Sequence, residues 1–223
     1  MVGVPAPRPV GSRRILLTGF DPFGGQPVNP SWEAVRQLQG WQVDGHSVVA
    51  AQLPTRFGLA LRVLDQLIDE HRPGLVLCTG QAGGRAALSL ERVAINVDDA
   101  RIPDNAGAQP VDVPVVPGGP AAYFTTLPIK AMLASLLEAG LRAEVSQTAG
   151  TFVCNHVFYG LMHRLARDPA LAGVRGGLMH VPWLPQQGHP SMTAEQLVLG
   201  LQVALRCALR TSHDRVLQAG ALN

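Results

Sequence analysis

Short apolar segments typical of strands alternate with longer segments of helical type along the chain. Apolar runs at residues 15–18, 75–78 and 177–181 are bounded by turn-forming residues, as is typical of strands buried on both faces. Residues 57–71 show apolar positions at helical spacing and end before Pro73 and Gly74. Because alternating strands and helices build βαβ units, the pattern predicts a single-domain three-layer α/β/α sandwich with a mostly parallel twisted sheet.

The remaining elements follow the same rules. We expect strands at residues 46–53 and 144–146, an extended strand or hairpin arm at residues 87–97, and helices at residues 30–39, 128–138, 154–167 and 193–211. Asn29 is expected to cap the first helix, with Pro30 in its first turn, and Thr193 with Gln196 forms a capping-box pattern. Asp, Pro and Gly are frequent at residues 98–119, which predicts a long functional loop.

No internal repeat or low-complexity linker divides the chain. We therefore expect one catalytic domain at residues 14–223, preceded by a loose N-terminal tail at residues 1–13. The tail lacks the apolar core of a signal peptide, and no apolar run reaches membrane-spanning length. These features predict a protein without a membrane partner.

Charge and cysteine content narrow the function class. The 223 residues include 18 basic and 16 acidic side chains, for a net charge of +2, and they contain no basic run. A nucleic-acid surface is therefore not expected. The three cysteines are widely spaced and odd in number, which does not fit a disulfide framework and favours a reducing, cytoplasmic compartment.

Cys154 is the candidate nucleophile. It follows a Gly-Thr turn in the run Gln-Thr-Ala-Gly-Thr-Phe-Val-Cys-Asn-His at residues 147–156 and opens a segment of helical spacing. Unpaired N–H groups and the helix dipole stabilise a thiolate in a first helical turn. The alternative is a packed cysteine at a helix start, and we expect that packing role for Cys78 in a strand and for Cys207 in mid-helix.

A cysteine nucleophile needs a base, and His180 is the best placed histidine. It closes the apolar strand at residues 177–181, and active sites of parallel sheets collect at the carboxyl ends of strands. Cys154 follows the preceding strand and loop, which predicts the same edge. His156 and His163 share a helix with Cys154 but point away from it by their spacing. The alternative for His180 is a buried structural imidazole.

The third group should orient the imidazole. Glu91 interrupts an apolar strand, although a strand carboxylate more often faces water or pairs with a neighbouring arginine. Asp98, Asp99 and Asp104 are rival acids in the loop. The chain has no His-Glu-x-x-His and no paired Cys-x-x-Cys, and residues 80–84 lack the order of a nucleotide-binding loop, so we expect neither a metal nor a cofactor.

Several long motifs resemble the pyroglutamyl-peptidase I family of cysteine peptidases. They lie at residues 16–25, 29–33, 80–85, 91–96, 100–107, 148–156 and 176–182, and the similarity extends from about residue 14 to residue 211. The resemblance implies that Cys154 is the nucleophile, His180 the base and Glu91 the orienting acid. It also implies hydrolysis of the amide bond after an N-terminal pyroglutamyl residue, by way of a thioacyl-enzyme.

The resemblance further implies a pocket for the lactam ring. Its expected members are Phe20, Phe23, Asn29, Gln81, Arg101 and Phe152. The first two are expected to flank the ring and the loop of Gln81 to supply polar contacts. The backbone N–H of Arg101 is expected to join that of Cys154 at the oxyanion.

Kinship also implies a homo-oligomer, a dimer or a tetramer, and peptides with an N-terminal pyroglutamate as partners. Ala106 stands where many relatives carry an acidic residue, and residues 186–190 fall in a variable region, which leaves fine specificity and assembly open. Two alternatives remain. One is a non-catalytic peptide binder, against which the three intact catalytic candidates argue. The other is a different enzyme of layered fold, such as a nucleoside phosphorylase, for which Arg85 and Arg101 are too few basic residues.

Overall fold

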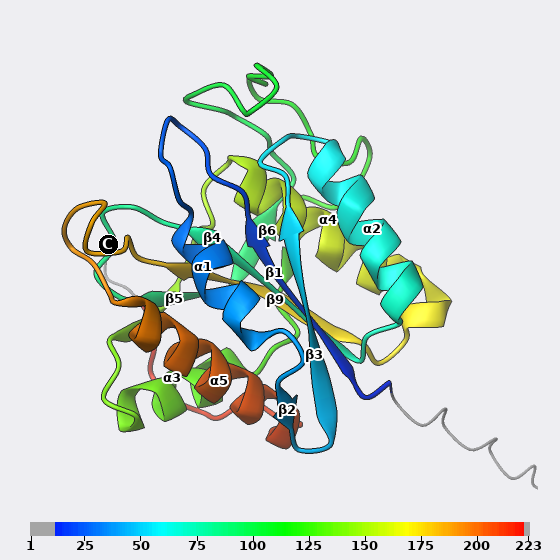
Figure 1. Ribbon diagram of the computed structural model, residues 1–223. Helices are drawn as coiled ribbons and strands as arrows, with labels where there is room; N and C mark the ends of the chain where they lie inside the picture. The colour runs from blue at the N-terminus through cyan, green and yellow to red at the C-terminus, as the bar shows by residue number, and fades with distance from the viewer. Residues whose placement is uncertain (1–11, 221–223) are drawn as a thin grey trace, which may run out of the picture.

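A twisted seven-stranded sheet forms the centre of the structure, a computed structural model that describes residues 12–220 (Figure 1). The strand order is β2-β3-β1-β4-β9-β5-β8. The strands are β1 (Arg14–Phe20), β2 (Gln42–Val43), β3 (His46–Leu53), β4 (Leu75–Gln81), β5 (Leu88–Glu91), β8 (Ala143–Ser146) and β9 (Arg175–Val181). The predicted N-terminal tail falls, apart from residues 12 and 13, outside the described residues.

Strand directions confirm a mostly parallel sheet and add a reversal. β1, β3, β4 and β9 are parallel to one another, whereas β2 is antiparallel to β3. β5 is antiparallel to β9 and parallel to β8. β5 and β8 therefore run against the four parallel strands β1, β3, β4 and β9, which brings the chain between β4 and β5 back beside β9.

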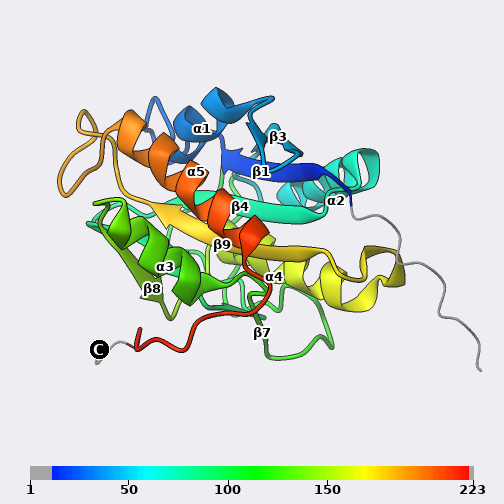
Figure 2. The ribbon, with the colours of Figure 1, turned by 90° about the horizontal axis from the view of Figure 1, so that it is seen from below.

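Helices cover both faces of the sheet, so the predicted three-layer α/β/α sandwich is confirmed. α1 (Pro30–Val35), the 3-10 turn η1 (Arg36–Leu38), α3 (Ile129–Glu138) and α5 (Ala194–Arg210) pack on one face. α2 (Leu59–His71) and α4 (Val153–Arg167) pack on the other, where the 3-10 turn η2 (Pro169–Leu171) follows α4. Figure 2 shows α3 and α5 on one side of β9 and α4 on the other. None of the helices within residues 12–220 is long and apolar enough to span a membrane.

The core consists of two apolar clusters, one on each face of the sheet. Side chains of a strand alternate between the faces, so Ile15 and Leu17 enter the cluster with α1, α3 and α5, whereas Leu16 and Phe20 enter the cluster with α2 and α4. Burying an aliphatic or aromatic side chain of this size stabilises the fold by about 1.5–3 kcal/mol. This two-sided burial explains why β1 reads as an unbroken apolar run.

Most elements agree with the sequence prediction, with four clear differences. The first is the two-residue strand β2, which the pattern did not predict. The segment predicted as an extended strand or hairpin arm at residues 87–97 divides at Arg92 into β5 and β6 (Val93–Ile95). β6 pairs with β7 (Ala122–Phe124), a three-residue strand that the pattern did not predict. The helix predicted to reach residue 39 ends as an α-helix at Val35 and continues as η1.

Both predicted helix caps are present. The Asn29 side chain accepts a hydrogen bond from Ser31 N, and Thr193 and Gln196 form the complete capping box of α5. Residues 98–119 contain an isolated bridge between Asp98 and Val113. The bridge ties the start of the predicted loop to a residue in its second half.

We expect Gly19→Ala to destabilise the fold. A Cβ on Gly19 would lie 2.7 Å from Trp32 N and 2.8 Å from Ser31 C, both backbone atoms of α1, so the helix would have to move off β1. Such overpacking typically costs about 1–3 kcal/mol. Denaturant unfolding measures the change, and Gly220→Ala, which meets nothing within 4 Å, is the control. A Gly19→Ala variant as stable as that control would contradict the close contact between α1 and β1.

Candidate active site

Cys154 lies in the first turn of α4, partly exposed to solvent. The residue before the helix, Phe152, provides no side-chain cap. The hydrogen-bond ladder of the helix begins with His156 N, which donates to the carbonyl of the N-cap residue, Phe152 O (3.1 Å). The backbone N–H groups of residues 153–155 therefore have no acceptor within the helix and present a positive dipole end beside the thiol.

His180 and Cys154 meet over Gly80. Gly80 pairs with His180 in the parallel register of β4 and β9. A Cβ on Gly80 would lie 2.6 Å from Cys154 Sγ and 3.3 Å from His180 Nε2. The absence of a side chain at Gly80 thus allows the thiol and the imidazole to approach each other above the strand.

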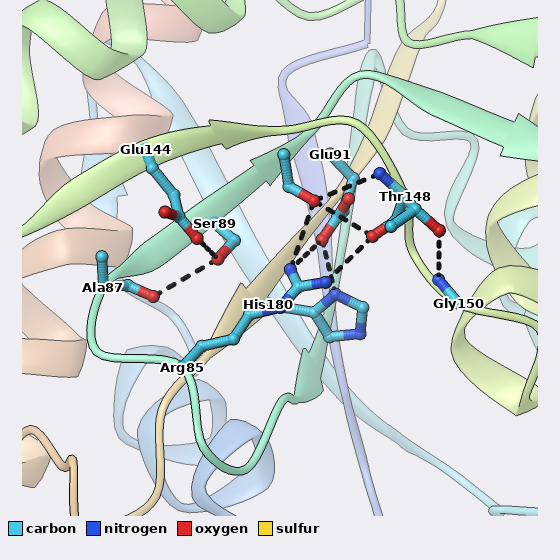
Figure 3. Close-up of polar contacts among 9 residues, drawn as sticks. Arg85, Ala87, Ser89, Glu91, Glu144, Thr148, Gly150 and His180 are labelled. Carbon is cyan, nitrogen blue, oxygen red and sulfur yellow. Dashed lines mark hydrogen bonds and ion pairs between the residues drawn. The ribbon is translucent and has the colours of Figure 1, made fainter. Parts of the chain in front are cut away.

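Glu91 holds the other side of the imidazole. His180 Nδ1 donates a hydrogen bond to Glu91 Oε1 (2.7 Å), and the carboxylate is fully buried. Because Nδ1 carries this proton, Nε2 is the nitrogen available to the thiol. The sequence pattern favoured a carboxylate that faces water or pairs with a neighbouring arginine. Its arginine partner is instead Arg85, whose Nη1 lies 2.7 Å from Oε1 (Figure 3).

The reversal of β5 and β8 explains how Glu91 reaches His180. In the antiparallel register of β5 and β9, Ser89 stands opposite His180, and Glu91 lies two residues further along the same face. We expected Cys154 to reach this edge from the carboxyl end of its preceding strand. That route is wrong, because β8 runs against β9 and the loop of residues 147–152 brings the chain back to the start of α4.

The pKa of His180 reflects these neighbours. Burial lowers the pKa of the imidazole, but the hydrogen bonds to Cys154 and Glu91 and the negative charges of both side chains raise it more strongly, to about 9. The imidazole is therefore protonated at neutral pH when it faces a thiolate. An imidazolium beside a thiolate is a ready nucleophile with an acid next to it.

A cavity of about 170 Å³ adjoins Cys154 and His180. Five of the six residues predicted for substrate binding line it: Phe20, Phe23, Asn29, Gln81 and Phe152. Arg101 is exposed and lies outside this lining. Thr55, Arg85 and Ala149 also line the cavity. Ala149 belongs to the motif at residues 148–156, whereas Thr55 belongs to none of the motifs, and only the fold brings it here.

Aromatic side chains form one wall of the cavity. The ring of Phe23 lies 5.9 Å from that of Phe152, and Phe57 meets Phe152 edge-on at 5.5 Å. Phe20, which also lines the cavity, is almost completely buried. Offset and edge-on contacts between aromatic rings are favourable, so the wall is preformed and apolar.

The polar lining residues are partly used by the fold. Asn29 Oδ1 accepts from Ser31 N and Ser31 Oγ, and its Nδ2 donates to Asp21 O (3.0 Å). Gln81 Oε1 accepts from Gln187 Nε2 (3.2 Å). Among the described residues, both N–H donors of the Gln81 amide and the second N–H of Asn29 Nδ2 have no acceptor.

The other candidate residues have structural partners. His156 Nδ1 donates to Asp98 Oδ2 (2.7 Å), and its Nε2 accepts from Gly58 N (3.0 Å), so neither nitrogen is available to Cys154. Burial raises the pKa of Asp104, but hydrogen bonds from three loop N–H groups and the charge of Arg56 together hold it below its usual value. Burial raises the pKa of Cys78 to about 12, which suits the predicted core thiol. Within residues 12–220 no three His, Cys, Asp or Glu side chains form a metal-binding group.

Comparison with known proteins gives one consistent result. A family model described as pyroglutamyl peptidase matches residues 13–211. A pyrrolidone-carboxylate peptidase of Cupriavidus necator is 59% identical over 216 residues, which cover 95% of this chain and 100% of the relative. A pyrrolidone-carboxylate peptidase of Klebsiella pneumoniae is 58% identical over 212 residues, with 93% and 98% covered.

Solved structures agree with these relatives. Pyroglutamyl peptidase I of Bacillus amyloliquefaciens superposes with a TM-score of 0.90 at 47% identity, and the match covers 92% of this chain and 99% of that one. A mutant pyrrolidone carboxyl peptidase of the hyperthermophile Pyrococcus furiosus gives a TM-score of 0.85 at 39% identity, with 88% and 98% covered. The fold and the sequence therefore point to the same group of proteins.

We expect Gly80→Ala to slow alkylation of Cys154 by iodoacetamide. The new methyl group would occupy the space between Sγ and the imidazole, and a displacement of about 1 Å in such a site costs on the order of 100-fold. The rate is measured on the Cys154 peptide by mass spectrometry, and circular dichroism verifies the fold. A folded variant that reacts at the wild-type rate would contradict the approach of the two side chains over Gly80.

We expect the alkylation rate of Cys154 to show a transition near pH 9, where the imidazolium of His180 loses its proton. In Glu91→Gln the transition should move to lower pH, because the lost carboxylate raises the pKa of His180 in the wild type. Rates measured from pH 5 to pH 10 cover both positions. A transition that stays near 9 in Glu91→Gln would assign the elevated pKa to another group.

Proposed function

Because the chain belongs to the pyroglutamyl peptidase family, we propose that Cys154, His180 and Glu91 are its catalytic residues. The protein is a cysteine-type exopeptidase that hydrolyses the amide bond after an N-terminal pyroglutamyl residue of peptides. The observation that carries the assignment of residues is the meeting of thiol and imidazole over Gly80, with a buried carboxylate behind the imidazole and an aromatic cavity beside it.

In the proposed mechanism His180 takes the proton of Cys154, and the thiolate attacks the pyroglutamyl carbonyl carbon. The carbonyl oxygen becomes an oxyanion, which accepts hydrogen bonds from the N–H of Cys154 and from the backbone N–H of Arg101. One such donor is typically worth about 100- to 1000-fold in rate. The imidazolium then gives its proton to the departing amine, leaving a thioester on Cys154.

Hydrolysis of the thioester completes the cycle. The neutral imidazole of His180 takes a proton from water, the resulting hydroxide attacks the thioester carbonyl, and free pyroglutamate leaves as the thiolate is restored. Glu91 accepts the Nδ1–H bond in every step, which keeps the imidazole in one tautomer and supports its positive charge.

The pocket suits a flat, uncharged lactam. Phe20, Phe23 and Phe152 provide apolar walls, and the cavity of about 170 Å³ limits the ligand to a small ring. The amide groups of Gln81 and Asn29 are proposed to contact the ring N–H and C=O. A free N-terminal amine would have to give up its hydration in this apolar pocket, which would disfavour ordinary peptides.

Three broader properties belong to the same proposal. We assign residues 14–223 to one catalytic domain, with residues 1–13 as a tail. A homo-oligomer, dimer or tetramer, is proposed from kinship, and the three unpaired cysteines favour a cytoplasmic location. Sedimentation of the purified protein measures the oligomeric state, and cell fractionation tests the location.

We expect a pyroglutamyl-coupled fluorogenic amide to be hydrolysed by the wild type and not by Cys154→Ala. The variant lacks the sulfur that forms the thioester, and losses of a catalytic nucleophile reach about a millionfold. Cys207→Ala is the matched control, because Cys207 lies on α5 and contacts Thr211 rather than the site. Turnover in Cys154→Ala close to that of the control would remove Cys154 as the nucleophile.

A further inference from the structure

Arg85 and His180 share one oxygen of Glu91. Arg85 Nη1 and His180 Nδ1 each lie 2.7 Å from Glu91 Oε1, and Figure 3 shows the two side chains converging on that carboxylate. Glu91 is fully buried, and its Oε2 accepts no hydrogen bond from any residue within 12–220. The charge of Glu91 is therefore compensated through a single atom by two cationic partners.

Arg85 also holds the loop that leads to Cys154. Its Nη1 donates to Ser146 Oγ (3.3 Å) and its Nη2 to Thr148 O (2.9 Å). Thr148 in turn accepts a hydrogen bond from Gly150 N through its Oγ1 (3.0 Å). The planar guanidinium can bond the carboxylate and the loop carbonyl at the same time because its N–H groups form a rigid fork.

We propose that Arg85 is a positioning residue of the acyl-transfer site, which compensates the charge of buried Glu91 and fixes the loop that carries Cys154. The inference rests on the proposed catalytic roles of Cys154, His180 and Glu91. In the active state the site holds a thiolate, an imidazolium, a carboxylate and the guanidinium, two charges of each sign. Without Arg85 the same site carries a net negative charge in a poorly hydrated region, which is unfavourable.

Few other ionisable groups face this cluster. Glu144 on β8 accepts a hydrogen bond from Ser89 Oγ (2.7 Å), as Figure 3 also shows, and contacts neither Arg85 nor His180 in the described residues. Cys78 on β4 is buried, and its pKa of about 12 keeps it neutral. Arg85 is thus the cation whose removal changes the electrostatic balance around His180 and Glu91.

Arg85 and Glu91 have opposite effects on the imidazolium of His180. Arg85 repels the imidazolium and competes with it for Oε1, so its removal should extend the protonated form of His180 to higher pH. Glu91 attracts the imidazolium, so its removal should shorten that range. If Arg85 served only to pack the loop, its removal would leave the pH at which His180 loses its proton unchanged.

The test compares Arg85→Met, Arg85→Lys and Arg92→Met. Arg92→Met removes an equal charge and a contact to the neighbouring loop residue, since Arg92 Nε donates to Gln147 Oε1 (2.8 Å) without touching Glu91. Alkylation of Cys154 by iodoacetamide is followed against pH without substrate, and turnover of the pyroglutamyl amide is measured separately. Circular dichroism verifies the fold of each variant.

We expect the upper transition of Arg85→Met to lie above the wild-type value of about 9, with turnover reduced about 10- to 100-fold. Arg85→Lys keeps the cation but cannot bond Glu91 and Thr148 together, so its transition should stay near the wild-type value while turnover falls. Arg92→Met should match the wild type in both measurements.

Several results would overturn the proposal. They are an unchanged or lowered transition in Arg85→Met, an equal shift in Arg92→Met, or wild-type turnover in Arg85→Lys. If Arg85→Met does not fold, the turnover of Arg85→Lys decides whether Arg85 is a positioning residue. The alkylation titration needs no substrate, so it tests the role of Arg85 independently of turnover. Failure of the wild type to hydrolyse pyroglutamyl amides would contradict the proposed function, and the titration would still test the effect of Arg85 on His180.

Discussion

The hydrogen bond between Glu91 and His180 is the interaction on which the catalytic arrangement depends. It joins a fully buried carboxylate to an imidazole that is itself almost excluded from water. In such surroundings an unpaired charge is strongly unfavourable, so each side chain requires the other. The bond fixes the tautomer of His180, aims Nε2 at Cys154 and makes the protonated imidazole stable enough to accompany a thiolate.

The reversal within the sheet makes this bond possible. If β5 ran parallel to β9, its residues would pair with β9 in another register, and Glu91 would not lie diagonally across from His180. The same reversal brings Arg85, in the connection before β5, onto the carboxylate, and the short β8 returns the chain toward the start of α4. Gly80 completes the arrangement by leaving space where any side chain would separate sulfur from nitrogen.

Local signals in the sequence predicted much of this structure. Apolar runs and helical spacing identified all but the shortest strands, and Asn29 and Thr193 identified helix starts, because these patterns depend on neighbours along the chain. Cys154 was recognisable as the first-turn residue of a helix for the same reason. β7 was not predicted, because three residues are too few to show the alternation of apolar and polar side chains that marks a strand.

The environment of Glu91 could not be read in this way. Its burial and its partners depend on the register of β5 against β9 and on the connection between β4 and β5 that carries Arg85. Neither of these produces a pattern among neighbouring residues of the sequence. Pattern alone favoured water or the adjacent arginine, and only the resemblance to a family indicated a catalytic role. Thr55 enters the cavity lining for an equally non-local reason.

The most direct measurement of the central claim is capture of the acyl-enzyme. A pyroglutamyl ester mixed with the wild type and quenched in acid within the first turnover should leave one pyroglutamyl group on the peptide that contains Cys154, as detected by mass spectrometry. Glu91→Gln should accumulate it more slowly, since its imidazole is less well oriented. A label on another residue, or turnover without any labelled peptide, would contradict a thiolate activated by His180 and Glu91.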